Sequence, residues 1–136
     1  WTIEFLSKVT ENLNSQGYLI TYSSSAAVRK TLRNLGLEIF TIKPSFKNRT
    51  FWSQGTVAIS KFDKNKLKPN FNFEKLSLME EEHLLTKASI PYRDQDLNSS
   101  KDDIIRRRLD EQLFSNLLST NKWREKWGMT KLSFKS

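Results

Sequence analysis

The segment 18–42 constrains the fold most strongly, because a strand pattern, a helix pattern and a second strand pattern follow one another within it. Residues 18–22 (YLITY) form an uncharged, β-rich run, typical of a strand buried on both faces in the middle of a parallel sheet. Apolar residues then recur at helical spacing over 26–35, with a serine available as N-cap and Gly36 as the stop. Residues 37–42 alternate as a second strand. This order predicts an α/β fold.

Further elements are expected on both sides of this unit. Residues 2–14 have the spacing of an amphipathic helix, and residues 56–60 (TVAIS) predict a third strand after a break at Gly55. Residues 62–75 show no sustained period and predict a linker or a wrapping arm. The remaining residues predict helices. One is expected over 76–88, with a capping box formed by Ser77 and Glu80, and a longer one begins near Ser99 or Ser100 and continues to Leu117. A final helical turn places Trp123 and Trp127 on one side, where they are expected to dock onto the domain.

Composition excludes several classes of protein. A chain of 136 residues with 37% hydrophobic residues can form one small domain. The absence of cysteine rules out a disulfide scaffold and a thiolate zinc site, and His83 is the single histidine, so no metal is expected. No run approaches the roughly 20 apolar residues that a membrane helix needs. A cytoplasmic protein without a membrane segment is therefore predicted.

The net charge of +8 favours polyanionic partners such as RNA. A basic segment, residues 43–52, carries Lys47 and Arg49 among aromatic residues and could hold RNA by charge and stacking. The alternative is a connection whose aromatic residues pack on the domain and whose cations are solvated. The arginine triplet 106–108 is open to the same two interpretations, because at most two of its members share a helix face and one can pair with Asp102, Asp103 or Asp110.

The polar residues Ser23, Ser24 and Ser25 follow the first predicted strand. Open α/β sheets bind ligands at the carboxyl ends of their strands, so these serines could line a substrate or cofactor cleft. They could equally form a turn in which one serine caps the next helix. Arg29 is expected at the surface or in contact with a phosphate rather than in catalysis. The acidic run 80–82 is interpreted as helix-start electrostatics and a solvated face rather than as a carboxylate site.

The stretch from Gly17 to Pro44 (GYLITYSSSAAVRKTLRNLGLEIFTIKP) resembles a segment near the end of the methyltransferase domain in the MnmC-like family of S-adenosylmethionine-dependent tRNA methyltransferases. The resemblance extends to Trp1-Thr2 and to the regions 48–49 and 55–58, so it covers about residues 1–60. The later run PYRDQDLNSSKDDIIRRR, with residues 119–124, is similar to a C-terminal extension of cyanobacterial single-domain members.

The resemblance implies transfer of a methyl group from S-adenosylmethionine to the exocyclic amine of 5-aminomethyl-2-thiouridine at the tRNA wobble position. Three features of the family's pattern are missing. A Gly-rich donor loop has no counterpart, the acidic catalytic loop lies upstream of the position that matches Trp1, and the family's Gly-Phe-Gly-Lys-Arg element is replaced by residues 45–49 (SFKNR). We therefore expect no catalytic residue and no bound cofactor in this chain alone, and whether it is an enzyme stays open.

Together these features predict the C-terminal part of a class I Rossmann-like methyltransferase sheet, with about three strands and flanking helices over residues 1–61, and a linker with a helical extension over 62–136. The chain is shorter than a complete domain of this class and opens on Trp1, so it is expected to be part of a longer polypeptide. An unpaired strand edge predicts a homodimer or strand exchange. The candidate RNA-binding residues are Ser23, Ser24, Ser25, Arg29, Lys47 and Arg49. A noncatalytic RNA- or partner-binding module and a small α/β protein of structural role are the alternatives.

Overall fold

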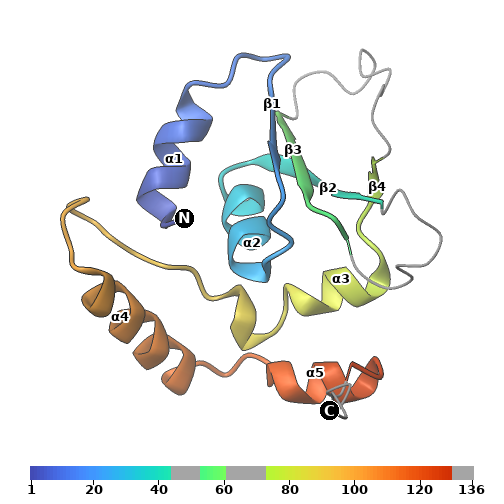
Figure 1. Cartoon of the computed structure of the whole chain (residues 1–136), viewed down its shortest axis with the longest axis vertical. Helices are drawn as coiled ribbons and strands as arrows, with labels where there is room; N and C mark the ends of the chain where they lie inside the picture. Colours follow the sequence, from blue (N-terminus) through green and yellow to red (C-terminus); the bar gives the residue numbers. More distant parts are fainter. Residues whose placement is uncertain (44–52, 61–72, 130–136) are drawn as a thin grey trace, which may run out of the picture.

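A computed structural model describes residues 1–43, 53–60 and 73–129 of the chain. Apart from β4 and η1, the elements follow the order expected from the sequence (Figure 1). They are α1 (Ile3–Glu11), β1 (Tyr18–Thr21), α2 (Ala26–Asn34), β2 (Leu37–Ile42), β3 (Thr56–Ser60), β4 (Phe73–Lys75), α3 (Leu78–His83), the short 3-10 helix η1 (Lys87–Ser89), α4 (Lys101–Phe114) and α5 (Thr120–Lys126).

The sheet has the strand order β1-β3-β2-β4, and each neighbouring pair is antiparallel. Because β1 and β2 both run antiparallel to β3, they are parallel to each other, and α2 crosses between them. The mixed α/β class is confirmed. The expectation that residues 18–22 lie in the middle of a parallel sheet is wrong, since β1 is an outer strand of the described sheet and its alternate side chains Tyr18 and Ile20 are 42% and 48% exposed.

The hydrophobic core lies between this sheet and helices α1 and α2. The alternation of β2 turns Leu37 and Ile39 inward, and the helical spacing of α2 directs Val28 and Leu32 toward the same space. Burial of one such aliphatic side chain stabilises the fold by about 2 kcal/mol. The core is completed by a further residue of α2 and by residues from α1, β3 and the segment around α3: Ala26, Leu6, Ala58, Leu76 and Leu84.

The segment after residue 72 belongs partly to the sheet. Phe73–Lys75, within the run expected to be a linker, form β4, which pairs with β2 through the register Phe40↔Lys75. Its Phe73 ring meets Phe40 edge-on at 5.2 Å between centroids, which favours the pairing. The chain then enters α3, whose capping box is the one predicted from Ser77 and Glu80.

Helix α4 begins at the predicted cap, because the Ser100 hydroxyl accepts a hydrogen bond from the backbone of Asp103. Polar side chains attach α4 to the rest of the chain. Arg108 donates to the carbonyls of Ile90 and Ala88 and lies over the Tyr92 ring. No residue of α4 is buried, and several of its apolar side chains are largely exposed: Leu109, Leu113 and Phe114.

Helix α5 packs beneath α3, as the two tryptophans predicted. Trp123 is buried, stacks on the His83 ring at 4.2 Å between centroids and donates its indole N–H to the Met79 carbonyl. Trp127 donates to the Glu82 carboxylate. In the part of the chain that is described, no helix is long and apolar enough to cross a membrane.

Candidate functional site

Three threonines mark one edge of the sheet. Thr21 ends β1, Thr56 begins β3, and Thr41 lies near the end of β2; the strand register places Thr21 opposite Thr56 and Thr56 opposite Thr41. Since β1 and β2 are parallel, this is the edge at which both strands end. We refer to it as the carboxyl edge. Open α/β sheets place their ligands at such an edge.

The serine segment lies at the carboxyl edge, as the sequence predicted. Ser23 donates its backbone N–H to the Thr21 hydroxyl, and its own hydroxyl accepts from the backbone of Ser25. Ser25 occupies the N-cap position of α2, but its hydroxyl makes no capping hydrogen bond. Ser23 and Ser24 are half-buried and Ser25 is exposed. The serines therefore form an internally bonded turn with Ser25 at the N-cap position, as one of the two interpretations predicted, although the Ser25 side chain adds no capping hydrogen bond.

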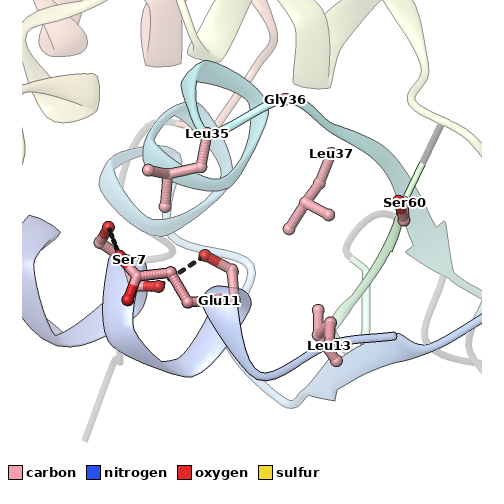
Figure 2. A pocket seen from close by; sticks show the side chains of 8 residues that line it. Ser7, Glu11, Leu13, Leu35, Gly36, Leu37 and Ser60 are labelled. Atoms are coloured by element: carbon pink, nitrogen blue, oxygen red, sulfur yellow. Dashed lines mark hydrogen bonds between the residues drawn. The ribbon is translucent and has the colours of Figure 1, made fainter. Parts of the chain in front are cut away.

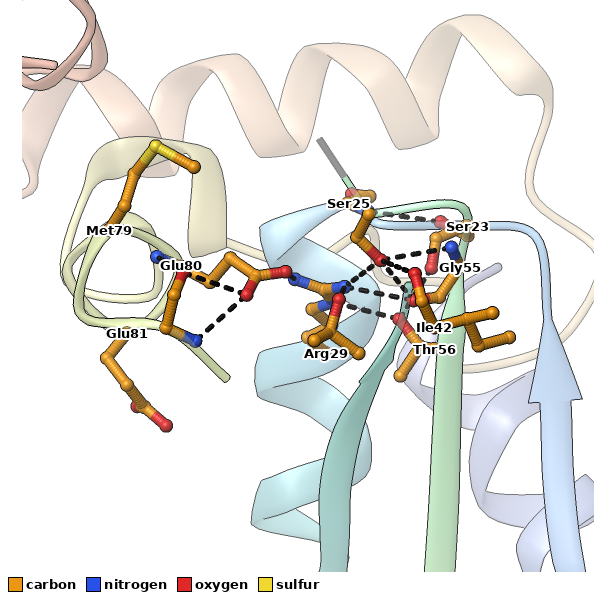
Figure 3. A network of polar contacts seen from close by, with 12 residues as sticks. Ser23, Ser25, Arg29, Ile42, Gly55, Thr56, Met79, Glu80 and Glu81 are labelled. Atoms are coloured by element: carbon orange, nitrogen blue, oxygen red, sulfur yellow. Dashed lines mark hydrogen bonds and ion pairs between the residues drawn. The ribbon is translucent and has the colours of Figure 1, made fainter. Parts of the chain in front are cut away.

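Arg29 is the most deeply enclosed charged residue of the carboxyl edge. Its side chain points from α2 toward the sheet and is fully buried (Figure 3). The Nε atom donates to the Thr56 hydroxyl at 2.8 Å, and Nη2 donates to the Gly55 carbonyl at 3.0 Å and to the Ser53 hydroxyl at 2.9 Å. The expectation that Arg29 lies at the surface is wrong, because the protein itself supplies acceptors for its guanidinium.

Glu80 provides the counter-charge for Arg29. Its Oε1 lies 2.9 Å from the Arg29 Nη1, while Oε2 accepts from both the backbone and the hydroxyl of Ser77. The pair is closed to solvent, with side chains 1% and 6% exposed. A buried guanidinium without a carboxylate would be strongly unfavourable, so α3 and α2 depend on each other at this point.

Burial and pairing change the titration of these groups. Burial lowers the pKa of Arg29, against the opposing effect of the Glu80 carboxylate. For Glu80, burial alone raises the pKa, but the Ser77 hydrogen bond, with further contributions from Thr41 and Arg29, leaves it below the usual 4.5. Burial, together with the charges of Arg29 and Arg124, lowers the pKa of His83 to about 4. At neutral pH the ion pair is charged and His83 is neutral.

The acidic run 80–82 thus makes three separate connections. Glu80 is buried, Glu81 forms a bidentate contact with Arg33, and Glu82 accepts from Lys126 and from Trp127. Helix-start electrostatics were predicted correctly through the capping box. The expectation of a solvated face is wrong for Glu80. Within residues 1–43, 53–60 and 73–129, no group of three or more His, Cys, Asp or Glu residues could hold a metal ion.

The structure describes some of the other basic residues but not all of them. Lys47 and Arg49 lie outside the described residues, although the chain leaves the sheet after β2 at Lys43 and returns at Ser53 on the carboxyl edge. Lys43 pairs with Glu74 at 2.6 Å. In the arginine triplet, Arg106 pairs with Asp103 at 2.7 Å, one of the pairings predicted for it, and Arg107 donates to the Ser99 hydroxyl.

A shallow pocket of about 270 Å³ lies at the opposite edge of the sheet, where β2 begins and β3 ends (Figure 2). Its lining combines Ser7 and Glu11 of α1 with Leu35, Leu37 and Ser60. The Ser7 hydroxyl donates to the Glu11 carboxylate within the pocket wall. The pocket contains none of the predicted site residues, so the carboxyl edge is the better candidate for the functional site.

Thr56, Ser53 and Glu80 are parts of the site that the sequence did not predict. Gly55-Thr56 enters the sequence prediction only through the family resemblance. One signal was present: Arg29 interrupts the apolar side of α2 between Val28 and Leu32, a position where a charge is unexpected unless it has a buried partner. Nothing in the local sequence indicates that this partner is 51 residues away.

The N-terminal part of the chain is similar to a known protein family. Residues 1–58 match the model of an S-adenosyl-L-methionine-dependent methyltransferase family. The match includes β1, α2, β2 and the start of β3, and it contains Arg29 with its acceptors at Ser53, Gly55 and Thr56. Glu80 lies outside it. Over these residues the chain is therefore similar to the methyltransferases that this family model describes.

The structural comparison is more specific. The crystal structure of MNMC2 from Aquifex aeolicus superposes with a TM-score of 0.67 and 29% sequence identity, covering 83% of this chain and 33% of that one. The uncharacterized protein MJ0670 of Methanocaldococcus jannaschii is 29% identical over 126 residues, which are 90% of this chain and 32% of MJ0670. The MnmC-like resemblance is confirmed. The chain spans about a third of the length of each relative.

Proposed function

We propose that this chain forms the C-terminal part of an S-adenosylmethionine-dependent tRNA methyltransferase that acts on wobble 5-aminomethyl-2-thiouridine. The observation that carries the proposal is the structural match to MNMC2, which continues beyond the 58 residues of the family match to 83% of the chain. The match therefore includes part of the helical extension. A location in the cytoplasm, where tRNA is modified, belongs to the same proposal.

Residues 1–43, 53–60 and 73–129 do not form a glycine loop of the kind that holds a methyl donor. A dinucleotide-type or donor loop needs glycines after a parallel strand, so that the backbone can approach the ligand. The turn after β1, residues 22–25, has no glycine. Gly55 does lie at the carboxyl edge, but the space beside it is taken, since an added Cβ would lie 2.2 Å from the Thr21 carbonyl oxygen. We propose that donor binding belongs to the part of the relatives that this chain does not match.

The proposed role of this chain is contact with the tRNA at the carboxyl edge. The hydroxyl groups of Ser23, Ser24 and Ser25 lie at this edge, and Lys47 and Arg49 belong to the stretch between β2 and β3, outside the described residues. Cations and hydroxyl groups are both suited to phosphate and ribose oxygens. Arg29 is not included among the contact residues, because its donors are directed to Thr56, Gly55, Ser53 and Glu80.

Calorimetry tests the proposal that this chain contacts tRNA and that the methyl donor binds elsewhere. Titration of the chain with S-adenosylmethionine is expected to give no heat of binding, while an unmodified wobble-uridine tRNA is expected to bind. The tRNA affinity should fall steeply between about 50 and 200 mM salt, because each neutralised phosphate releases counterions. Heat from the donor would contradict the assignment of donor binding to another region. Salt-dependent binding of any RNA, without preference for tRNA, would favour a noncatalytic RNA-binding module instead.

We also propose that β1, an outer strand of the described sheet, associates with a second copy of this chain. In the described sheet β1 pairs only with β3, and Tyr18, Ile20 and Tyr22 expose apolar side chains beside the open edge. An edge strand with unpaired backbone groups is a template for a further strand. Strand exchange and pairing of two β1 edges are both consistent with this arrangement.

A charge on the edge should weaken the dimer. Ile20→Lys is expected to raise the dimer dissociation constant at least about tenfold, since lysines on edge strands disfavour strand addition. Sedimentation equilibrium of wild type and variant measures the change. Leu109→Lys is the matched control, because it places the same charge on the exposed apolar side of α4. An equal effect of both variants, or a wild-type chain that is monomeric at high concentration, would contradict the edge dimer.

A further inference from the structure

We propose that Arg29 and Glu80 are positioning residues, through which the helical extension fixes the geometry of the carboxyl edge. The inference rests on the proposed function, in which this edge contacts tRNA. The starting observation is that Arg29 belongs to the family-matched residues 1–58, whereas Glu80, its ion-pair partner, belongs to α3. The edge is therefore completed by a carboxylate from another part of the chain.

The guanidinium of Arg29 holds the segment that leads into β3 at the carboxyl edge. Through Nη2 it holds the Gly55 carbonyl and the Ser53 hydroxyl, which are the residues that lead into β3. Through Nε it holds the hydroxyl of Thr56. All of these contacts are between 2.8 and 3.0 Å, so one rigid planar group sets the path of the chain over residues 53–56.

Thr56 passes this constraint on to the serine turn. Its hydroxyl accepts from Arg29 and donates to the Ser23 carbonyl at 2.7 Å. Thr56 is completely buried, so water cannot replace either partner. The turn at Ser23 and the entry to β3 are thereby held in one fixed arrangement (Figure 3).

Glu80 determines the orientation of Arg29. One of its oxygens receives Nη1, and the other is fixed by the two hydrogen bonds from Ser77, so the carboxylate cannot turn without breaking the capping box of α3. With Nη1 fixed by Glu80, Nε and Nη2 are directed toward Thr56 and Gly55. The order of contacts is α3, Arg29, Thr56 and the serine turn.

The pair of variants Thr56→Val and Thr56→Ser tests this order. Valine has the shape of threonine without the hydroxyl, and serine retains the hydroxyl. Amide hydrogen exchange measured by NMR on the whole chain should show exchange of the Ser23 and Ser25 amides about tenfold faster in Thr56→Val, the effect of one lost buried hydrogen bond, and close to wild type in Thr56→Ser. The tRNA dissociation constant should rise about tenfold in Thr56→Val alone.

The outcomes separate this proposal from the proposed function. Unchanged exchange at Ser23 and Ser25 in a folded Thr56→Val chain overturns the positioning role, as does faster exchange with unchanged tRNA affinity. If the wild-type chain does not bind tRNA, the proposed function fails, and the exchange data alone decide whether Thr56 transmits the constraint. If Thr56→Val does not fold, Ser53→Ala takes its place: exchange of the Gly55 amide, which donates to Ser53, should rise together with that of Ser23, and a change confined to Gly55 overturns the proposal.

Discussion

Glu80→Gln is expected to lower the free energy of unfolding by about 3 kcal/mol, because it leaves the buried Arg29 guanidinium without its counter-charge. Glutamine has nearly the same shape and also serves in a capping box, so the start of α3 is retained. With its amide oxygen on Ser77, its NH2 group faces Arg29 Nη1 and cannot accept from it, so the variant removes both the charge and the acceptor. Chemical denaturation at neutral pH measures the loss. It would be a large fraction of the stability of a domain of this size.

Glu81→Gln is the matched control on the same helix. Glu81 also pairs with an arginine, Arg33. The side chains of Arg33 and Glu81 are 35% and 43% exposed, however, so solvent screens their interaction. The expected loss is below about 1 kcal/mol. Equal losses in the two variants would show that the enclosed position of Glu80 has no special role, and would contradict the dependence of α2 on α3.

The pH dependence provides a further check on this prediction. The lowered pKa of Glu80 means that its contribution is fully present above its usual 4.5 and is lost as the pH falls through the folded-state value. The pKa of His83 is lowered from 6.5 to about 4, so the unfolded chain binds a proton at a higher pH than the folded chain does. The folded state is therefore favoured above pH 6.5, and this contribution is lost as the pH falls from 6.5 to about 4. Glu80→Gln should therefore remove only the acid sensitivity below about pH 4.5, and the slope between 4 and 6.5 should persist.

Gly55→Ala is expected to cost about 1–3 kcal/mol, because the added methyl group meets a backbone atom and not a movable side chain. The Cβ would lie 2.2 Å from the Thr21 carbonyl oxygen and 3.1 Å from the Tyr22 Cα, so β1 and β3 would have to separate at the carboxyl edge. Thermal and denaturant unfolding measure the loss.

Ser25→Ala is the control for the glycine variant, since Ser25 lies close to the same edge, is exposed and makes no capping hydrogen bond with its side chain. Its expected effect is below about 0.5 kcal/mol. A Gly55→Ala chain as stable as Ser25→Ala would mean that the edge is loose enough to absorb the methyl group. That result would also contradict the rigid path of residues 53–56 on which the positioning role of Arg29 depends.

Local sequence patterns predicted most of the helices and strands, but they did not predict how the strands are arranged in the sheet. The alternation of residues 37–42, the run 56–60 and the Ser77–Glu80 pair each contain their own signal, and β2, β3 and α3 begin where these signals do. The position of β1 was misassigned because a four-residue strand carries no information about its neighbours. β4 was missed because it has only three residues within an aperiodic segment.

Only the part of the site that is local in the sequence was predicted. Ser23–Ser25 follow directly from the end of a strand, and the structure places them at the edge where both parallel strands end. Arg29 was placed at the surface because arginines are seldom fully buried unless paired. Its partners come from β2, β3 and α3, so the pairing is a property of the tertiary structure. The division into residues 1–61 and 62–136 stays a prediction, and the Arg29–Glu80 pair crosses it.

The order of strands has a consequence for synthesis on the ribosome. β3 lies between β1 and β2, although it is made after both, and β4 is made later still. No backbone ladder of the described sheet can begin until residues 56–60 have left the exit tunnel. Until then the nascent chain can form α1 and α2, but the two earlier strands have no partner among the described strands. A pause in translation shortly before this point would extend the period in which their backbone groups are open to aggregation or to chaperones.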